Sequence, residues 1–327
     1  MNYSGFMSKL ELAYAPLSNH DFTLIKSEEI IQEILTDSML YVLAQRSMLT
    51  FENIVESEEG GSICFEIHKQ GSHEILNCEL PFYQEHLGQD ETKSVTIEFG
   101  SYDPNWSQTV TPIKGVNGCK FYDHEGNFLL WLSPDKFLHL YWNKELEGNI
   151  VGDIKEFTKF MVHYVGKSTD QPIHERLTGH YTLQDILSLE RPLISGSLPT
   201  HEIILLLFRV TDAYKISILE DDIQSFIENM DGKNVPDKKT VSLDAEKALV
   251  KLLNPEYNHP TKRFPNYPKS KDGLFKFGFN RYIYGIKENI TLQYSDVEIV
   301  GDVNENKADI IWIEENKTIE IIKISKN

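Results

Sequence analysis

The sequence has few cysteines and few basic residues, and both shortages limit what the protein can be. Its 327 residues include 3 cysteines, Cys64, Cys78 and Cys119, which form no C-x-x-C pair. We therefore expect a reducing compartment and no structural zinc site. Lysine and arginine total 32 against 50 aspartates and glutamates, a net charge of −18. Because this charge repels nucleic acid and anionic membranes at long range, any contact with nucleic acid must be local.

Long apolar runs are also missing. The longest, residues 203–208, is much shorter than a membrane span, and the first residues do not have the layout of a signal peptide. We therefore expect a cytoplasmic protein that makes no membrane contact. The hydrophobic fraction of 40% and the aromatic fraction of 11% are ordinary for a globular chain, so disorder is not expected.

The hydrophobic pattern predicts an α+β fold. Apolar residues recur at helical spacing from Ile30 to Leu35, whereas alternating apolar residues at 62–68 and 94–100 predict strands with one buried face. Residues 156–167 are rich in aromatic and β-branched side chains and also predict a strand. The turn signal Ser133-Pro134-Asp135 separates two further predicted strands, the second of which contains "KFLHLYWN".

These elements suggest three segments in a chain long enough for more than one domain. We predict an N-terminal α+β domain over residues 1–132, which would recognise a substrate or a partner. A central domain would cover 133–272 and carry an acidic, exposed insertion at about 190–240. The alternating runs after residue 273 predict a short β-rich C-terminal element over 273–327.

The tetrapeptide Gly166-Lys167-Ser168-Thr169 has the form in which a nucleotide-binding phosphate loop ends. Such a loop also needs a glycine five residues before the second one, to begin the turn that points backbone N–H groups at phosphates. Met161 stands at that place. A nucleotide-binding protein is therefore the weakest of the functional hypotheses, and no nucleotide cofactor is expected.

The predicted helix over residues 243–253 carries a carboxylate on its apolar side. Glu246 precedes Leu249, Val250 and Leu253 by three, four and seven residues, which places all four on one face. A carboxylate that faces a core is costly unless it is paired or bound to a cation. Alternatively, Glu246 lies in the first turn of the helix, solvated and stabilised by the helix dipole.

Three separated motifs resemble the GIY-YIG nuclease superfamily. The stretch Tyr164-Val165-Gly166 resembles its Tyr-Ile-Gly strand, and Arg176 and then His180 follow on the next helical segment. The stretch "EKALVKLLNPEYN" resembles the closing motif, in which the metal-binding glutamate is Glu246 and the asparagine is Asn258. The Gly-Ile-Tyr motif has no clean copy. Its best match is His139-Leu140-Tyr141, which keeps the tyrosine and lacks the glycine.

The resemblance covers residues of about 135–270 and implies a small mixed α/β nuclease core that hydrolyses phosphodiester bonds. It implies that Glu246 holds one Mg²⁺ or Mn²⁺ and that Arg176 contacts the scissile phosphate. Tyr141 or Tyr164 would orient or deprotonate the attacking water, and His180 would assist or replace them. The same resemblance gives Asn258 the role of binding phosphate or bracing the site, and it puts the backbone at Gly166 and Lys167 beside the substrate.

The stretch that follows the closing motif is basic within an acidic protein. Over residues 259–281 basic side chains outnumber acidic ones, and phenylalanines lie between them. This pattern suits a surface that tracks a nucleic-acid backbone and stacks on bases, but it also suits a solvated turn whose phenylalanines enter the core. The candidate nucleic-acid-binding residues are Lys262, Arg263, Lys269 and Lys271.

The leading hypothesis is a metal-dependent endonuclease that acts on DNA, with RNA as the alternative substrate. Cleavage of both strands by one such site would require a homo-oligomer or two sequential nicks. By analogy alone, a role in restriction or anti-phage defence is predicted. The main alternative is a catalytically inactive GIY-YIG-like module for nucleic-acid binding or assembly, which the missing glycine and the net charge of −18 favour.

Overall fold

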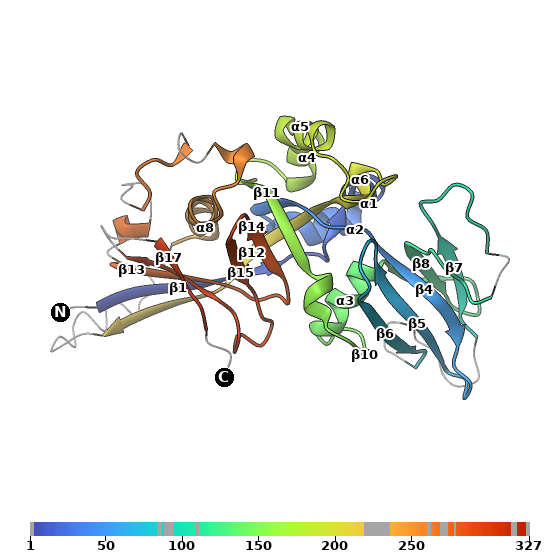
Figure 1. Cartoon of the computed structure of the whole chain (residues 1–327). Helices are drawn as coiled ribbons and strands as arrows, with labels where there is room; N and C mark the ends of the chain where they lie inside the picture. Colours follow the sequence, from blue (N-terminus) through green and yellow to red (C-terminus); the bar gives the residue numbers. More distant parts are fainter. Residues whose placement is uncertain are drawn as a thin grey trace. The chain divides into compact units, whose positions relative to one another are not determined.

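The predicted α+β class is confirmed by the computed structural model, which contains helices and three β-sheets (Figure 1). The structure describes residues 3–83, 87, 94–108, 111–218, 236–259, 263–268, 274–277, 279–314 and 319–324. Over these ranges, no helix is long and apolar enough to cross a membrane.

The chain forms two compact units that differ from the predicted segments. Unit 1 comprises Met1–Arg46, Lys159–Arg191 and Pro199–Asn327, and unit 2 comprises Ser47–Thr158 and Pro192–Leu198. The predicted boundaries near 132 and 272 therefore do not coincide with the division of the chain. The C-terminal strands are not a separate extension, because they pair into the same sheet as the N-terminal strand of unit 1.

Unit 1 is built on a 10-stranded sheet in the order β15-β14-β11-β3-β12-β1-β13-β16-β17, with β2 paired to β12. The pairs β1–β13 and β11–β14 are parallel and the others are antiparallel. The strands are β1 (Tyr3–Leu12), β2 (Leu17–Ser18), β3 (Leu40–Gln45), β11 (Lys159–Lys167), β12 (Ile203–Ile218), β13 (Arg281–Ile286), β14 (Thr291–Tyr294), β15 (Val297–Val300), β16 (Ile310–Glu314) and β17 (Ile319–Ile322).

Helices accompany this sheet, and the longest of them, α8, packs against β11, β3 and β12. The helices of unit 1 are α1 (Asn19–Ile25), α2 (Glu29–Ile34), α4 (Ile173–Thr178), α5 (Tyr181–Leu189), α6 (Pro199–Glu202) and α8 (Lys238–Leu253). The short 3₁₀ turns are η1 (Leu35–Asp37), η3 (Glu256–Asn258) and η4 (Leu274–Phe277).

Strand β3 lies in the interior of the sheet, and every one of its residues is buried. Its sequence, LYVLAQ, is apolar except for Tyr41 and Gln45, and it pairs with β11 on one side and β12 on the other. A strand that is covered on both faces needs such a continuous apolar run instead of alternation. The helical spacing that begins at Ile30 ends at η1, because the apolar residues from Leu40 onward belong to strand β3. Helix α2 is therefore shorter than the apolar pattern of the sequence.

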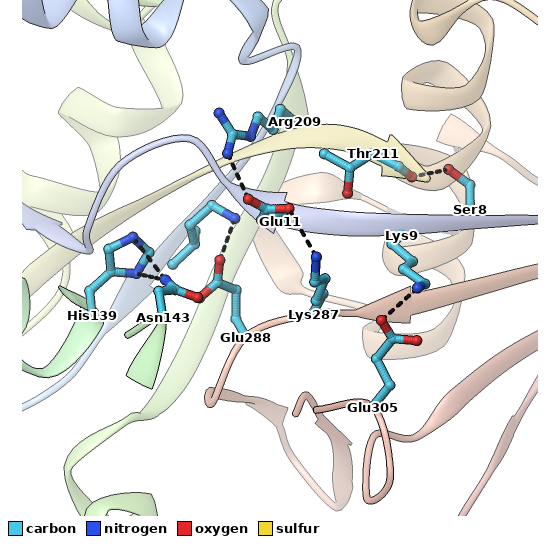
Figure 2. A network of polar contacts seen from close by, with 11 residues as sticks. Ser8, Lys9, Glu11, His139, Asn143, Arg209, Thr211, Lys287, Glu288 and Glu305 are labelled. Carbon is cyan, nitrogen blue, oxygen red and sulfur yellow. Dashed lines mark hydrogen bonds and ion pairs between the residues drawn. The ribbon is translucent and has the colours of Figure 1, made fainter. Parts of the chain in front are cut away.

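Charged residues on β1 are stabilised by ion pairs with neighbouring strands (Figure 2). Arg209 Nη2 donates to Glu11 Oε1 at 2.6 Å, and Lys287 Nζ lies 3.8 Å from Glu11 Oε2. Lys9 Nζ pairs with Glu305 Oε1 at 2.5 Å. These pairs join β1 to β12 and to the segment after β13, so the N-terminal and C-terminal parts of the chain belong to one folded unit.

Among its described residues, unit 2 contains two antiparallel sheets and one α-helix. The first sheet has the order β10-β6-β5-β4 and the second has the order β7-β8-β9. The elements are β4 (Leu49–Glu56), β5 (Ser62–Lys69), β6 (Ile75–Pro81), β7 (Thr96–Gly100), β8 (Gly118–Tyr122), β9 (Phe128–Leu132), α3 (Pro134–Trp142), β10 (Asn149–Val151) and the 3₁₀ turn η2 (Ile154–Phe157). The strands predicted at 62–68 and 94–100 are confirmed as β5 and β7.

The prediction of a strand at "KFLHLYWN" is wrong, because these residues form most of helix α3. The Ser133 side chain accepts a hydrogen bond from the Lys136 N–H, and Pro134 occupies the first helical position. Serine before proline is typical of a helix start. The same letters that suggest a turn therefore begin the helix, and Tyr141 stacks on Phe137 one turn away, with ring centroids 6.4 Å apart.

The predicted insertion at about 190–240 is only partly described. Residues 203–218 within it form strand β12 of the sheet of unit 1, and the part from Ile203 to Phe208 is buried. The acidic stretch "EDDIQSFIENMD" lies outside the described residues.

Candidate active site

Two tyrosines from neighbouring strands of unit 1 lie side by side. In the antiparallel pair of β3 and β11, Tyr41 is opposite Gly166, and Tyr164 is two residues before Gly166 on the same face. The two rings have centroids 6.1 Å apart. A Cβ atom at Gly166 would lie 2.5 Å from Tyr41 Oη and 2.6 Å from Tyr164 Cε1. The missing side chain of Gly166 therefore makes room for both rings.

His180 connects this pair of rings to helix α5. It is the N-cap of that helix, and its Nδ1 accepts a hydrogen bond from the Leu183 N–H at 3.0 Å. Its Nε2 lies 2.8 Å from Tyr41 Oη. Because an accepting Nδ1 carries no proton, the proton of the neutral ring is on Nε2 and is donated to Tyr41 Oη. Tyr41 is therefore the acceptor in this bond and keeps its own hydroxyl proton for another partner.

The ionisation of both groups is shifted by burial. Burial, together with the charges of Arg176 and Arg263, lowers the pKa of His180 to about 4, so the imidazole is neutral near neutral pH. Burial also raises the pKa of Tyr41, and Tyr164 and Glu246 act in the same direction, whereas the charge of Arg176 and its hydrogen bond oppose them. A proton leaves Tyr41 more easily when positive charge near its oxygen increases.

Glu246 approaches the tyrosines from helix α8, where its side chain is only 2% exposed. Asp237 is the N-cap of α8, so Glu246 lies in the interior of the helix and not in a solvated first turn. Its Oε1 accepts a hydrogen bond from Arg263 Nη2 at 2.8 Å, and Arg263 Nη1 donates to Tyr164 Oη at 3.0 Å. One guanidinium therefore joins the carboxylate to a tyrosine.

Several cations surround this buried carboxylate. Burial raises the pKa of Glu246, while the charges of Arg263, Lys167, Lys247 and Arg176 act to lower it. Burial alone would lower the pKa of Arg263, but Glu246 and Tyr164 outweigh it, so this pKa is raised. A protein with a net charge of −18 thus concentrates positive charge at one place, as a site for an anion such as a phosphate requires.

Asn258 stabilises the strand that carries Tyr164. Its Oδ1 accepts from the Val165 N–H at 2.8 Å, and its Nδ2 donates to the Val165 carbonyl oxygen at 2.7 Å. The side chain is buried, and its amide makes to Val165 the two backbone hydrogen bonds that a neighbouring strand would make. Of the two expected roles of Asn258, bracing the site is the one that these contacts favour.

The donor set fits a divalent cation that keeps most of its water. Within the described ranges, no three or more His, Cys, Asp and Glu side chains form a group that could hold a metal ion. Glu246 would therefore supply one hard oxygen ligand, and water and phosphate would supply the others, an arrangement that Mg²⁺ accepts. A cation held by Glu246 would lie beside the Arg263 guanidinium, whose charge would oppose it.

Comparison with known proteins gives no significant match: no family model, curated protein or solved structure corresponds to this chain. The function must therefore be argued from the side chains themselves.

The structure brings together most, but not all, of the residues that the sequence predicts for the site. The expected residues that meet in unit 1 are Tyr164, Gly166, Lys167, Arg176, His180, Glu246, Asn258 and Arg263. Tyr141 belongs to helix α3 of unit 2 and not to a strand. Lys262, Lys269 and Lys271 lie outside the described residues.

Tyr41 is the residue of this site that sequence reasoning missed. One signal was present: after Thr36-Asp37-Ser38 the helical spacing ends, and Leu40 to Ala44 form a continuous apolar run typical of a buried strand. The second miss is the role of Arg263, expected on a nucleic-acid surface and found paired with Glu246.

Proposed function

We propose that unit 1 is a metal-dependent phosphodiesterase of the GIY-YIG type, which acts as an endonuclease on DNA. The observation that carries the proposal is the meeting of Tyr41, Tyr164, His180 and the Glu246–Arg263 pair. These side chains come from two adjacent strands, a helix N-cap, the long helix α8 and, for Arg263, the segment after η3. In this reading the sequence match at Tyr141 is replaced by Tyr41, which lies on a strand paired with that of Tyr164.

The cluster contains the groups that hydrolysis of a phosphodiester requires. Arg176 and Lys167 would hold the charge of the phosphate, because guanidinium and ammonium groups pair with its oxygens. Glu246 would hold a hydrated Mg²⁺ or Mn²⁺, which supplies further charge neutralisation when it is bound. Because Tyr41 is fully buried, a water admitted with the substrate would first take its proton, and Tyr41 would then accept the proton of the attacking water.

His180 has a positioning role in this mechanism. Its Nε2–H is directed at Tyr41 Oη, and a neutral donor at that place stabilises the phenolate oxygen without adding a proton-transfer step. Arg176 provides the second stabilising contact on Tyr41. His180 and Arg176 act against the burial that raises the pKa of Tyr41, and the charge of a bound divalent cation would act in the same direction.

The test is cleavage of supercoiled and linear DNA with Mg²⁺ or Mn²⁺, compared among three variants. Tyr41→Phe and Glu246→Gln are expected to lower the rate by about 10²-fold or more, the usual contribution of a general base or of a charged group at the reacting centre. Tyr141→Phe is the matched control, since it removes the same hydroxyl from a tyrosine of unit 2, and it should cleave at the parental rate. Circular dichroism spectra of all three should coincide with the parent.

Two outcomes would contradict the proposal in different ways. Full activity in Tyr41→Phe together with loss in Tyr141→Phe would show that the wrong tyrosine has been assigned. Binding of DNA or RNA without cleavage under any metal condition would support the inactive binding module. The inactive binding module is favoured by one observation: Arg263 is already paired with Glu246, the residue that would hold the metal.

A further inference from the structure

Arg263 donates hydrogen bonds to two side chains that the proposed reaction needs, Glu246 and Tyr164. Its Nη2 donates to Glu246 Oε1 at 2.8 Å and its Nη1 donates to Tyr164 Oη at 3.0 Å. While the guanidinium is bound, its positive charge opposes the binding of a divalent cation at the same carboxylate. The arrangement is therefore a resting state with respect to metal.

The two partners differ in their freedom to move. The Glu246 side chain is 2% exposed and comes from the interior of α8, whereas the Arg263 side chain is 32% exposed. Arg263 otherwise contacts the faces of Tyr164 and Phe264, at 5.7 and 5.4 Å from the ring centroids. Such contacts are weak at exposed sites, so they do not fix the guanidinium strongly.

Neither partner can leave alone. A buried carboxylate without a counter-charge is strongly destabilising, so Arg263 departs only if another cation replaces it at Glu246. Arg263 in turn needs an anion, and a phosphate offers the two oxygens that its planar fork pairs with best. Because Arg176 and Lys167 already act on Glu246, a phosphate held by them lies within the same group of charges.

We propose that Arg263 exchanges Glu246 for the substrate phosphate, so that divalent-cation binding and phosphate binding are positively coupled through this one side chain. The inference rests on the proposed function, and it makes Arg263 a catalytic residue that contacts the scissile phosphate. Without substrate, Arg263 competes with the metal and keeps its affinity low. With substrate, the guanidinium moves to the phosphate and the carboxylate becomes available. Linkage requires that each ligand strengthen the other by the same factor.

The experiment measures Mn²⁺ binding by electron paramagnetic resonance, with and without a short DNA duplex. All proteins carry Tyr41→Phe, so that the duplex is not cleaved. The variant is Arg263→Gln, and the control is Arg209→Gln, which removes an arginine of similar exposure, 38%, from an ion pair with Glu11 (Figure 2). Arg263→Lys is the second variant, since it keeps the charge but lacks the fork that reaches both partners.

The expected results concern Mn²⁺ affinity, its dependence on DNA, and cleavage. Arg263→Gln binds Mn²⁺ about tenfold more tightly than the parent in the absence of DNA, which is the effect of removing a competitor worth about 1.4 kcal/mol. DNA tightens Mn²⁺ binding to the parent and to Arg209→Gln but not to Arg263→Gln. Arg263→Lys lies between these two behaviours. In the Tyr41→Phe background, Arg263→Gln cleaves DNA no faster than Tyr41→Phe alone, and with Tyr41 restored it cleaves more slowly than the parent despite its tighter metal binding.

Equal Mn²⁺ affinity in the parent and Arg263→Gln, or equal enhancement by DNA in both, would overturn the inference. If Arg263→Gln fails to fold, Arg263→Lys decides by the same two readouts. The binding measurement is independent of turnover. Coupling without cleavage would therefore refute the endonuclease and leave the exchange by Arg263 intact. Cleavage without coupling would refute the exchange and leave the endonuclease intact.

Discussion

Two glycines in strands of unit 1 should respond in opposite directions to the same substitution. Gly166 in β11 and Gly285 in β13 both lack a positive φ, so an alanine is allowed by the backbone at either place. A Cβ at Gly285 meets no atom within 4 Å, whereas a Cβ at Gly166 would lie 2.5 Å from Tyr41 Oη. We therefore predict that Gly285→Ala stabilises the protein and that Gly166→Ala destabilises it.

The magnitude at Gly166 follows from what must move. Carbon contacts are most favourable at about 3.5–4.0 Å, so the Tyr41 ring has to shift by about 1 Å. Overpacking of this kind costs about 1–3 kcal/mol. Tyr41 is fully buried and holds His180, and the weakened hydrogen bond adds about 0.5–1.5 kcal/mol. Subtracting the gain of about 0.5–1 kcal/mol from replacing glycine in a strand leaves a net loss of about 2 kcal/mol.

Urea unfolding, monitored through hydrogen exchange of the β11 and β13 amides, measures both changes in stability. Amide exchange reports the free energy of opening of unit 1 separately from that of unit 2. Gly285→Ala should raise this free energy by about 0.5–1 kcal/mol, because only the entropy of the unfolded chain changes. An unchanged or higher stability of Gly166→Ala would refute the reasoning, since the Tyr41 ring could not then lie over Gly166.

Two further predictions concern groups that support the site. The pKa of His180 is lowered from 6.5 to about 4 in the folded chain, so the unfolded chain binds the extra proton first as the pH falls through this window, and stability is lost. After allowance for solvent screening this loss is about 2 kcal/mol, and His180→Asn, which keeps a cap acceptor, should remove it from urea midpoints measured at both ends of the window; an unchanged pH dependence would contradict the assignment. Asn258→Ala leaves the Val165 N–H and carbonyl without their side-chain partner and should cost about 2–4 kcal/mol in the same assay. A cost below about 0.5 kcal/mol, typical of surface substitutions, would show that Asn258 does not brace β11.

Local pattern was sufficient where a structure is determined by neighbours in the chain. The strand that contains Tyr164 follows from its run of aromatic and β-branched residues, and it is confirmed as β11. Helical spacing puts Glu246 on the apolar side of its helix, and the side chain is indeed buried. In both cases the periodicity of the backbone decides which side chains share a face.

Local pattern failed where two helix signals had to be weighed against strand propensity. "KFLHLYWN" contains aromatic residues suited to a strand, but Ser133 and Pro134 begin a helix ahead of it. Similarly, the helix predicted over residues 243–253 begins earlier, at Lys238 after the Asp237 cap. Where a helix begins depends on whether the preceding residues are already helical. Packing of that earlier turn against the sheet decides whether they are.

The sequence alone determined the acidic balance, the mixed α+β class, and the residue types Tyr164, Arg176, His180 and Glu246 at spacings that suggest phosphate chemistry. Only the tertiary structure decided which tyrosine faces Tyr164 and which cation holds Glu246. Tyr41 and Gly166 are opposite each other although the whole of Ser47–Thr158 lies between their strands. Pairing between strands so far apart depends on burial on both faces of β3 and on the space left by one missing Cβ, and neither is visible in local periodicity.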